Sequence, residues 1–218
     1  MTALVAVAAG VLGLFVGVLV NRAAGRFPWS PDEPESGHAV RRPVVEAGTA
    51  LTFALTAVRF GPSWELPAFL FLAGAAVLLT VIDLQHKLLP NRIVLPSIGI
   101  GAGLLAVAAL GTGEWTALLR GVIAAAVLYV VFVVLVLISP RSIGMGDAKL
   151  AALLGLYLGW LGWELVLLGI AAGFVVQAVL AVLLLATRRV GLKGELPFGP
   201  AMLLGAALVI GWSDALLP

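Results

Sequence analysis

Two aspartates, Asp83 and Asp147, are the residues of this chain best suited to chemistry. Asp83 opens Asp-Leu-Gln-His-Lys-Leu-Leu-Pro-Asn after a long apolar run, and Asp147 lies in Gly-Met-Gly-Asp-Ala-Lys before another. Ionisable side chains next to apolar segments are costly and often functional. Two carboxylates that share a site do not both ionise readily, so one holds a proton while the other acts as a base. Such a pair could activate water against a peptide carbonyl and protonate the leaving amine.

Each aspartate also has a simpler interpretation. Asp83 could be a charge that ends a helix in the lipid headgroup region, where charged residues are common. Asp147 could be a helix N-cap, a position at which Asp is favoured. Two glycines, Gly144 and Gly146, precede Asp147 and would permit close approach of another backbone, which favours a functional role.

Other membrane protease chemistries lack their parts. The sequence has no His-Glu-x-x-His motif for zinc, and its only histidines are His38 and His86. It has no cysteine, so thiolate metal sites and cysteine nucleophiles are excluded. No serine stands in a readable motif with a histidine or lysine. We therefore predict no metal site.

The composition indicates that this chain folds in a bilayer. Of its 218 residues, 62% are hydrophobic and 11% are charged, whereas soluble proteins have roughly 25% charged residues. The mean hydropathy is +1.15. The formal net charge is only +2, and the basic residues are scattered, so no nucleic acid partner is expected. We predict an all-α, polytopic membrane protein with a single membrane-embedded domain over residues 1–218.

The apolar runs predict about eight transmembrane helices, since each span needs ~20 apolar residues. The sixth run is short and is expected to continue through Gly159 and Leu161. No Lys or Arg precedes the first run, so we expect it to be retained rather than cleaved as a signal peptide. A short polar loop is predicted at about 21–43. The runs are Ala3–Val20, Val44–Phe60, Pro67–Ile82, Ile93–Leu110, Leu118–Ile138, Leu150–Leu158, Leu165–Ala186 and Phe198–Ile210.

The basic residues predict the orientation of these helices. All but two of the 13 Lys and Arg residues lie in the first, third, fifth and seventh connections, and the exceptions are Arg59 and Arg120. By the positive-inside rule these odd-numbered connections are cytoplasmic and both termini are outside. This topology places Asp83 and Asp147 at the same cytoplasmic membrane face, although it was derived without either residue.

These residues carry a resemblance to a known family, the type IV prepilin peptidases, which are membrane aspartyl peptidases of the GxGD class. The similarity covers nearly the whole chain and lies in five motifs that occur in the family's order. They are Gly17, Asn21, Arg26 and Pro28; Arg42-Pro43 with Glu46; Ile82-Asp83 with Leu89-Pro90-Asn91; Gly144-Met145-Gly146-Asp147 with Lys149-Leu150, followed by Gly155 and Leu158-Gly159-Trp160; and Pro197-Phe198-Gly199-Pro200.

The resemblance implies that Asp83 and Asp147 are the catalytic pair. Members of the family remove the basic leader from prepilins or pseudopilins of type IV pili and secretion systems, at the cytoplasmic face of the bacterial cell membrane. The expected partners are therefore these substrates and membrane lipid. As hypotheses, further motif residues bind substrate or shape the cleft, namely Gly144, Gly146, Lys149, Pro90, Asn91, Pro197, Phe198, Gly199 and Pro200.

The chain departs from the bifunctional members of this family at one place. Those members carry an insert with two Cys-x-x-Cys pairs, whereas the interval here is only Trp29–Arg41 and has no cysteine. Bifunctional members also N-methylate the new amino terminus with S-adenosylmethionine. We expect no cofactor for proteolysis, and S-adenosylmethionine only if methyltransferase activity is retained.

Two other functions stay open: a transporter in which the aspartates relay protons, and a non-catalytic assembly factor of a pilus or secretion system. Two finer expectations follow from position. Asp83 at a helix C-terminus and Asp147 at a helix N-terminus would make Asp147 the ionised base and Asp83 the protonated acid. Arg26 and Glu46, at the two ends of the polar loop, could form an ion pair.

Overall fold

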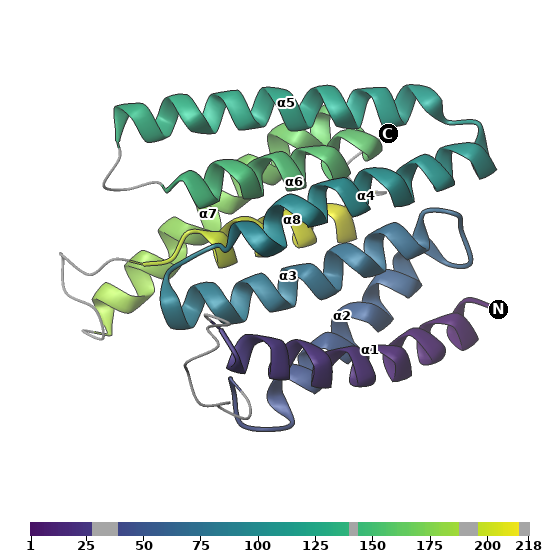
Figure 1. Cartoon of the computed structure of the whole chain (residues 1–218), viewed down its shortest axis with the longest axis horizontal. Helices are drawn as coiled ribbons and strands as arrows, with labels where there is room; N and C mark the ends of the chain where they lie inside the picture. Colours follow the sequence, from purple (N-terminus) through teal and green to yellow (C-terminus); the bar gives the residue numbers. More distant parts are fainter. Residues whose placement is uncertain (28–38, 140–143, 188–195, 214–218) are drawn as a thin grey trace.

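The structure, a computed structural model, describes residues 1–27, 39–139, 144–187 and 196–213. Eight α-helices make up most of these residues, and they lie side by side as a bundle (Figure 1). The prediction of an all-α fold is confirmed. The helices are α1 (Thr2–Gly25), α2 (Val44–Phe60), α3 (Leu66–His86), α4 (Asn91–Thr112), α5 (Trp115–Ile138), α6 (Met145–Leu161), α7 (Trp163–Ala186) and α8 (Gly199–Gly211).

Helix bounds differ from the apolar runs mainly at the charged ends. The first helix continues to Gly25, over the start of the predicted loop, and α3 continues past Asp83 to His86. The short sixth run does extend to Leu161 as expected, but α6 begins earlier, at Met145. A helix can continue through polar residues, because its hydrogen bonds are made by the backbone. A fall in hydropathy therefore indicates the edge of the bilayer rather than the end of the helix.

Five of the described helices, α1, α3, α4, α5 and α7, are long and apolar enough to cross a membrane. Their outer surfaces carry exposed large apolar side chains, such as Phe15, Leu137 and Leu167. An exposed apolar surface of this extent is unusual for a soluble monomer and typical of a lipid-facing one. The chain is therefore a multi-pass membrane protein, whereas eight complete spans and the placement of the termini stay predictions.

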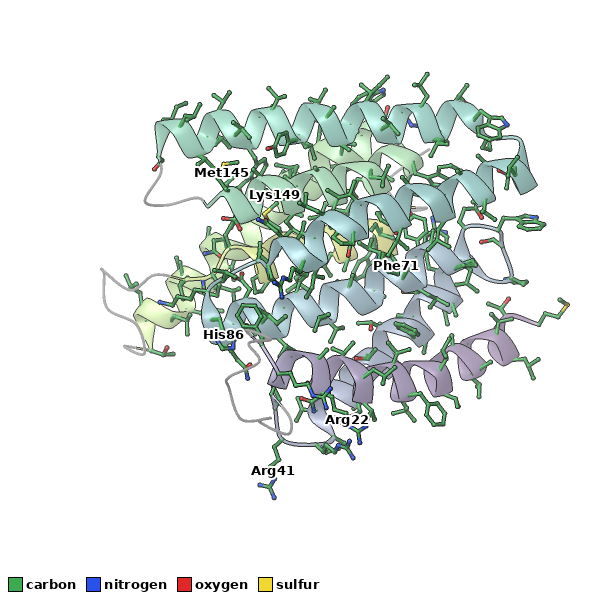
Figure 2. The ribbon with its side chains drawn as sticks, in the orientation of Figure 1. Arg22, Arg41, Phe71, His86, Met145 and Lys149 are labelled. Atoms are coloured by element: carbon green, nitrogen blue, oxygen red, sulfur yellow. The ribbon has the colours of Figure 1, made fainter. Side chains whose placement is uncertain are left out.

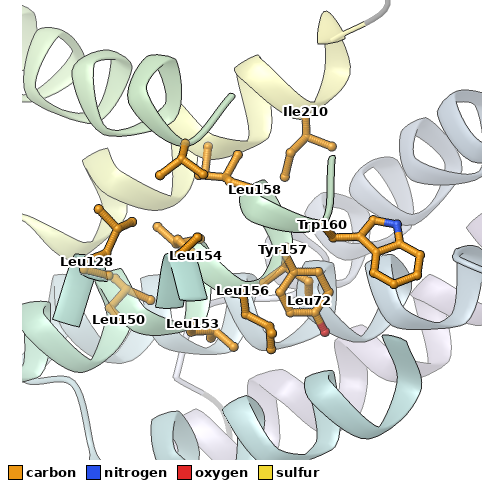
Figure 3. Close-up of a cluster of buried hydrophobic side chains, with 14 of the residues drawn as sticks. Leu72, Leu128, Leu150, Leu153, Leu154, Leu156, Tyr157, Leu158, Trp160 and Ile210 are labelled. Carbon is orange, nitrogen blue, oxygen red and sulfur yellow. The ribbon is translucent and has the colours of Figure 1, made fainter. Parts of the chain in front are cut away.

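Helix α6 forms the centre of the bundle. All residues from Leu150 to Trp160 are buried, and Figure 3 shows several of their side chains in the apolar cluster around α6. Its glycines allow close packing on α5, because a Cβ on Gly155 would lie 2.8 Å from the Ala124 carbonyl oxygen. A helix this fully enclosed keeps its ends at fixed places within the bundle.

Short turns join the helices at one end of the bundle. Residues 61–65 join α2 to α3, Gly113 and Glu114 join α4 to α5, and Gly162 alone joins α6 to α7. The positive φ of Gly113, 82°, ends α4 in the left-handed conformation that glycine adopts without strain. Figure 1 shows the N-terminus and the α4–α5 turn at the right, and the first turns of α4 and α6 at the opposite end.

The connection from α1 to α2 is held by the side chain of Asn21, which is fully buried. Its amide nitrogen donates to the Val40 carbonyl and its amide oxygen accepts from the Val40 N–H, both at 3.0 Å. We call this pair the Asn21 clamp. Glu46 next to it forms an ion pair with Arg42 at 3.2 Å, so the contacts of Glu46 do not support the expected pairing with Arg26.

Candidate active site

Asp83 lies in the last turn of α3 and is buried, with 4% of its surface exposed. The Lys87 N–H donates to the Asp83 carbonyl at 2.8 Å, and Lys87 takes a left-handed φ of 52°, which ends the helix. Helix α3 therefore ends before Pro90. Pro90 instead caps the start of α4 with an extended backbone, where its fixed φ and missing N–H are tolerated.

The start of α8 reaches the Asp83 carboxylate. The Gly199 N–H donates to Asp83 Oδ2 at 3.2 Å. A Cβ on Gly199 would lie 2.6 Å from the same oxygen, which is closer than any side chain tolerates. Glycine at this position is therefore what allows a backbone N–H to contact the carboxylate.

Asp147 lies in the first turn of α6 and is half-buried. The N-cap is Gly144 rather than Asp147, and Asp147 Oδ2 accepts the Gly144 N–H at 2.9 Å. The Asp147 N–H in turn donates to the Gly144 carbonyl at 3.0 Å. The simple interpretation of Asp147 as the N-cap is therefore wrong in position, although its side chain does satisfy a backbone N–H at the helix start.

The two carboxylates lie at the same end of the bundle, on segments that pack against one another. Leu89 helps to bring them together, because it lies against both Gly146 and Gly199: a Cβ on Gly146 would be 2.9 Å from Leu89 Cβ, and one on Gly199 would be 3.3 Å from Leu89 Cδ1. The four motif segments, at the end of α3 and at the starts of α4, α6 and α8, thus meet at one end of the bundle.

The polar rim of this site joins α6 to α4. Lys149 Nζ donates to Asn91 Oδ1 at 2.7 Å. Figure 2 shows Met145 and Lys149 toward the same end of the molecule as His86, Arg22 and Arg41. These basic side chains come from α6, α3 and α1 and from the segment just before α2.

Aromatic contacts fix the segment before α8. The ring of Phe198 lies 5.1 Å from that of Phe174 on α7 and 6.4 Å from that of Phe132 on α5, measured between centroids. Phe198 directly precedes Gly199, so these contacts hold the backbone whose N–H meets Asp83. Pro197 and Pro200, which flank this pair, are half-buried.

The site contains contributors that the sequence prediction did not include. Leu89 belongs to one of the family motifs, but the sequence predicted no role for it. Its position directly before Pro90 is the one feature that could have indicated a role. Phe132 and Phe174 lie in uniformly apolar helices and carried no signal. Arg141, His38 and the acids of the polar loop lie outside the described residues. Within the described ranges, no group of three His, Cys, Asp or Glu could hold a metal ion.

The helix-dipole argument for Asp83 changes with this geometry. Asp83 lies in the C-terminal turn of α3, as expected, but it also contacts the N-terminus of α8. The two helix ends act on its charge with opposite sign. The expectation that Asp83 is the protonated partner therefore loses the support of its helix position.

A scan of known families matches residues 70–187 to the type IV leader peptidase family. Among curated relatives, a prepilin leader peptidase/N-methyltransferase of Pseudomonas aeruginosa is 33% identical over 180 residues, which are 80% of this chain and 59% of the relative. The protein of the same name from Pseudomonas putida is 34% identical over 181 residues, 81% of this chain and 60% of the relative. The one from Bacillus subtilis is 31% identical over 180 residues, with shares of 80% and 67%.

The chain thus spans about three fifths of the length of the Pseudomonas relatives that it matches. No solved structure matches it. The family match includes both aspartates and ends before the Pro197–Pro200 segment, in which the Gly199 N–H contacts Asp83.

Proposed function

Because the chain belongs to the type IV leader peptidase family, we propose that it is a membrane aspartyl peptidase with Asp83 and Asp147 as its catalytic pair. The observation that carries this proposal is the packing of the two carboxylate-bearing segments at one end of the bundle, where Leu89 lies against both Gly146, which precedes Asp147, and Gly199, whose N–H meets Asp83. Each of them also accepts a backbone N–H through Oδ2. Among the described residues no hydrogen bond to Oδ1 of either carboxylate is present, so Oδ1 is the oxygen that we assign to water and substrate.

The arrangement supports general acid–base hydrolysis. One carboxylate, ionised, takes a proton from a water molecule as the water attacks the scissile carbonyl carbon. The other, protonated, gives its proton to the carbonyl oxygen as the tetrahedral intermediate forms. When the intermediate collapses, the first carboxyl passes the proton that it took from water to the leaving amine, and the second recovers a proton from the hydroxyl of the intermediate. The backbone N–H groups of Gly199 and Gly144 hold the carboxylates in place during these transfers. The scissile segment must be extended, since a helical backbone hides its carbonyl.

We propose that the substrate is the leader junction of a prepilin or pseudopilin, since the relatives are named prepilin leader peptidases. By the positive-inside rule the site faces the cytoplasm at the bacterial cell membrane, and both termini are outside. The names of the relatives favour proteolysis over a proton-coupled transporter. S-adenosylmethionine is a co-substrate only if the chain also carries out the methylation that the names of its relatives give.

The test is co-expression with a candidate prepilin that carries its leader. Wild type is compared with Asp83→Ala, Asp147→Ala and the control Glu164→Ala, an exposed acid in the first turn of α7. We expect leader removal by wild type and the Glu164 variant and none by the aspartate variants. Cleavage by either aspartate variant would overturn the catalytic pair. Wild type that leaves every prepilin intact would favour the non-catalytic assembly factor, and mass spectrometry of the mature amino terminus decides methylation.

A further inference from the structure

Arg59 and Arg120 are the two basic residues that the positive-inside rule does not explain, and both reach the end of a short buried helix. Arg120 on α5 donates from Nε to the Gly159 carbonyl and from Nη2 to the Trp160 carbonyl, each at 2.6 Å. The Gly162 N–H satisfies the preceding carbonyl, that of Leu158. Arg120 thus takes the next two carbonyls at the C-terminus of α6.

Arg59, near the end of α2, contacts the C-terminal end of α8 through one carbonyl and one hydroxyl. Its Nε donates to the Ile210 carbonyl at 3.2 Å, and its Nη2 donates to the Ser213 hydroxyl at 2.6 Å. The Ser213 hydroxyl donates in turn to the Ile210 carbonyl at 2.9 Å. The last carbonyls of a helix lack partners within it, and a guanidinium supplies donors in a fixed planar fork as well as a positive charge at the negative end of the helix.

The two helices whose C-terminal ends these arginines contact, α6 and α8, also contribute to the site with their N-termini. Helix α6 carries Asp147, and α8 presents the Gly199 N–H to Asp83. From Gly159 to Asp147, and from Ile210 to Gly199, the helix rise gives about 16 to 18 Å. Helices α6 and α8 have 17 and 13 residues, against 21 to 24 in the five long apolar helices. Because α6 and α8 are shorter than the helices that can cross a membrane, their length alone does not fix their position along the axis of the bundle.

We propose that Arg59 and Arg120 are positioning residues that fix α8 and α6 along their axes, so that Asp83 and Asp147 stay at the same depth. Both contacts lie at the opposite end of the bundle from the aspartates. Because a helix transmits an axial displacement along its whole length, loss of a cap at one end displaces the groups at the other. The catalytic consequence rests on the proposed peptidase function, whereas the positional consequence does not.

The activity test uses the full chain, purified and reconstituted, with a leader-bearing prepilin. Arg120→Met and Arg59→Met keep the length of the side chain and remove its donors, and Arg120→Lys and Arg59→Lys keep the charge. We expect kcat to fall about 10- to 100-fold in the Met variants, the loss that a misplacement of about 1 Å produces, with KM little changed and partial recovery in the Lys variants. The matched control is Leu165→Ala, a buried residue of α7 at the same end, which lowers stability without removing a cap.

A second measurement does not depend on activity. The chain has no cysteine, so Asn91→Cys with Lys149→Cys reports the start of α6 against α4, and Phe174→Cys with Phe198→Cys reports the start of α8 against α7. A short bifunctional thiol reagent should cross-link the first pair at a changed rate in the Arg120→Met background, and the second in the Arg59→Met background.

Unchanged cross-linking rates in both Met backgrounds would overturn the proposal, even if kcat falls. Equal losses of kcat in the Met variants and in Leu165→Ala would overturn it as well. If wild type does not cleave the prepilin, the peptidase function fails, and the cross-linking rates alone still decide whether the arginines position α6 and α8.

Discussion

The Gly199 N–H donates to Asp83 Oδ2 at 3.2 Å across 116 residues of sequence. This bond places the N-terminus of one helix against the carboxylate at the C-terminal end of another. It also makes the Asp83 site depend on a residue with no side chain, since any Cβ at position 199 would collide with the carboxylate.

Gly199→Ala should therefore lower leader cleavage about 10- to 100-fold, because the carboxylate must move by a fraction of an ångström to one ångström. The measurement is the initial rate of prepilin cleavage by purified enzyme. Gly211→Ala is the matched control at the other end of α8, where a Cβ meets none of the described residues within 4 Å. Equal rates for wild type and Gly199→Ala would show that the contact is not needed.

The two glycines before Asp147 should differ in their tolerance of a side chain. A Cβ on Gly146 would lie 2.9 Å from Leu89 Cβ, whereas, among the described residues, one on Gly144 comes no nearer than 3.6 Å to any atom outside its immediate neighbours. Gly146→Ala should lose most of the cleavage activity and Gly144→Ala should keep most of it. The same rate assay, with protein level checked by immunoblot, measures both, and a reversed order would contradict the packing of Leu89.

Asn21→Asp should destabilise the protein by about 2–4 kcal/mol, because it removes a buried donor and places a second carboxylate beside Glu46. The Asn21 amide nitrogen is 3.4 Å from Glu46 Oε1. The control is Asn91→Asp, the same change at an exposed residue whose neighbour is Lys149. Thermal unfolding in detergent should separate the two, and an unchanged midpoint for Asn21→Asp would count against the clamp.

Tyr157→Phe should leave the free energy of unfolding unchanged or raise it by about 1 kcal/mol, since a buried hydroxyl without a partner is unfavourable. Tyr157 is fully buried in α6, and its hydroxyl has no hydrogen-bond partner in the described structure. Tyr157→Ala, which removes the ring, should instead cost roughly 3–5 kcal/mol. A clearly less stable Phe variant would mean that the hydroxyl has a partner, such as a buried water.

The sequence predicted the helices well because apolar runs and basic residues respond to the bilayer itself. It also predicted both aspartates as a pair at one end, since the alternation of helices carries Asp83 and Asp147 to the same end. Contacts between segments that are far apart in the sequence were harder to predict. Nothing in the pattern around Gly199 indicated a hydrogen bond to Asp83, and Phe132 and Phe174 were indistinguishable from lipid-facing residues in their helices.

Arg59 and Arg120 are a second case in which the sequence did not predict contacts between helices. Counting charges identified them as exceptions, but only the packing shows that each meets helix carbonyls. Likewise, a uniformly apolar sequence did not reveal that α6 is enclosed while α5 and α7 expose large side chains. Helical periodicity and hydropathy distinguish residues in a membrane from residues in water. Within a bilayer they do not distinguish residues of the protein interior from residues that face lipid.

The Asn21 clamp also defines an insertion point. Its two hydrogen bonds join the chain on either side of residues 28–38, so the ends of that connection are set by contacts outside it. The entropic free-energy cost of closing a loop rises by only about 0.6 kcal/mol for each doubling of the loop length. A folded module grafted between Phe27 and Ala39 would therefore leave α1, α2 and the aspartates in place, and such a connection can lengthen or shorten in evolution at little expense to the membrane core.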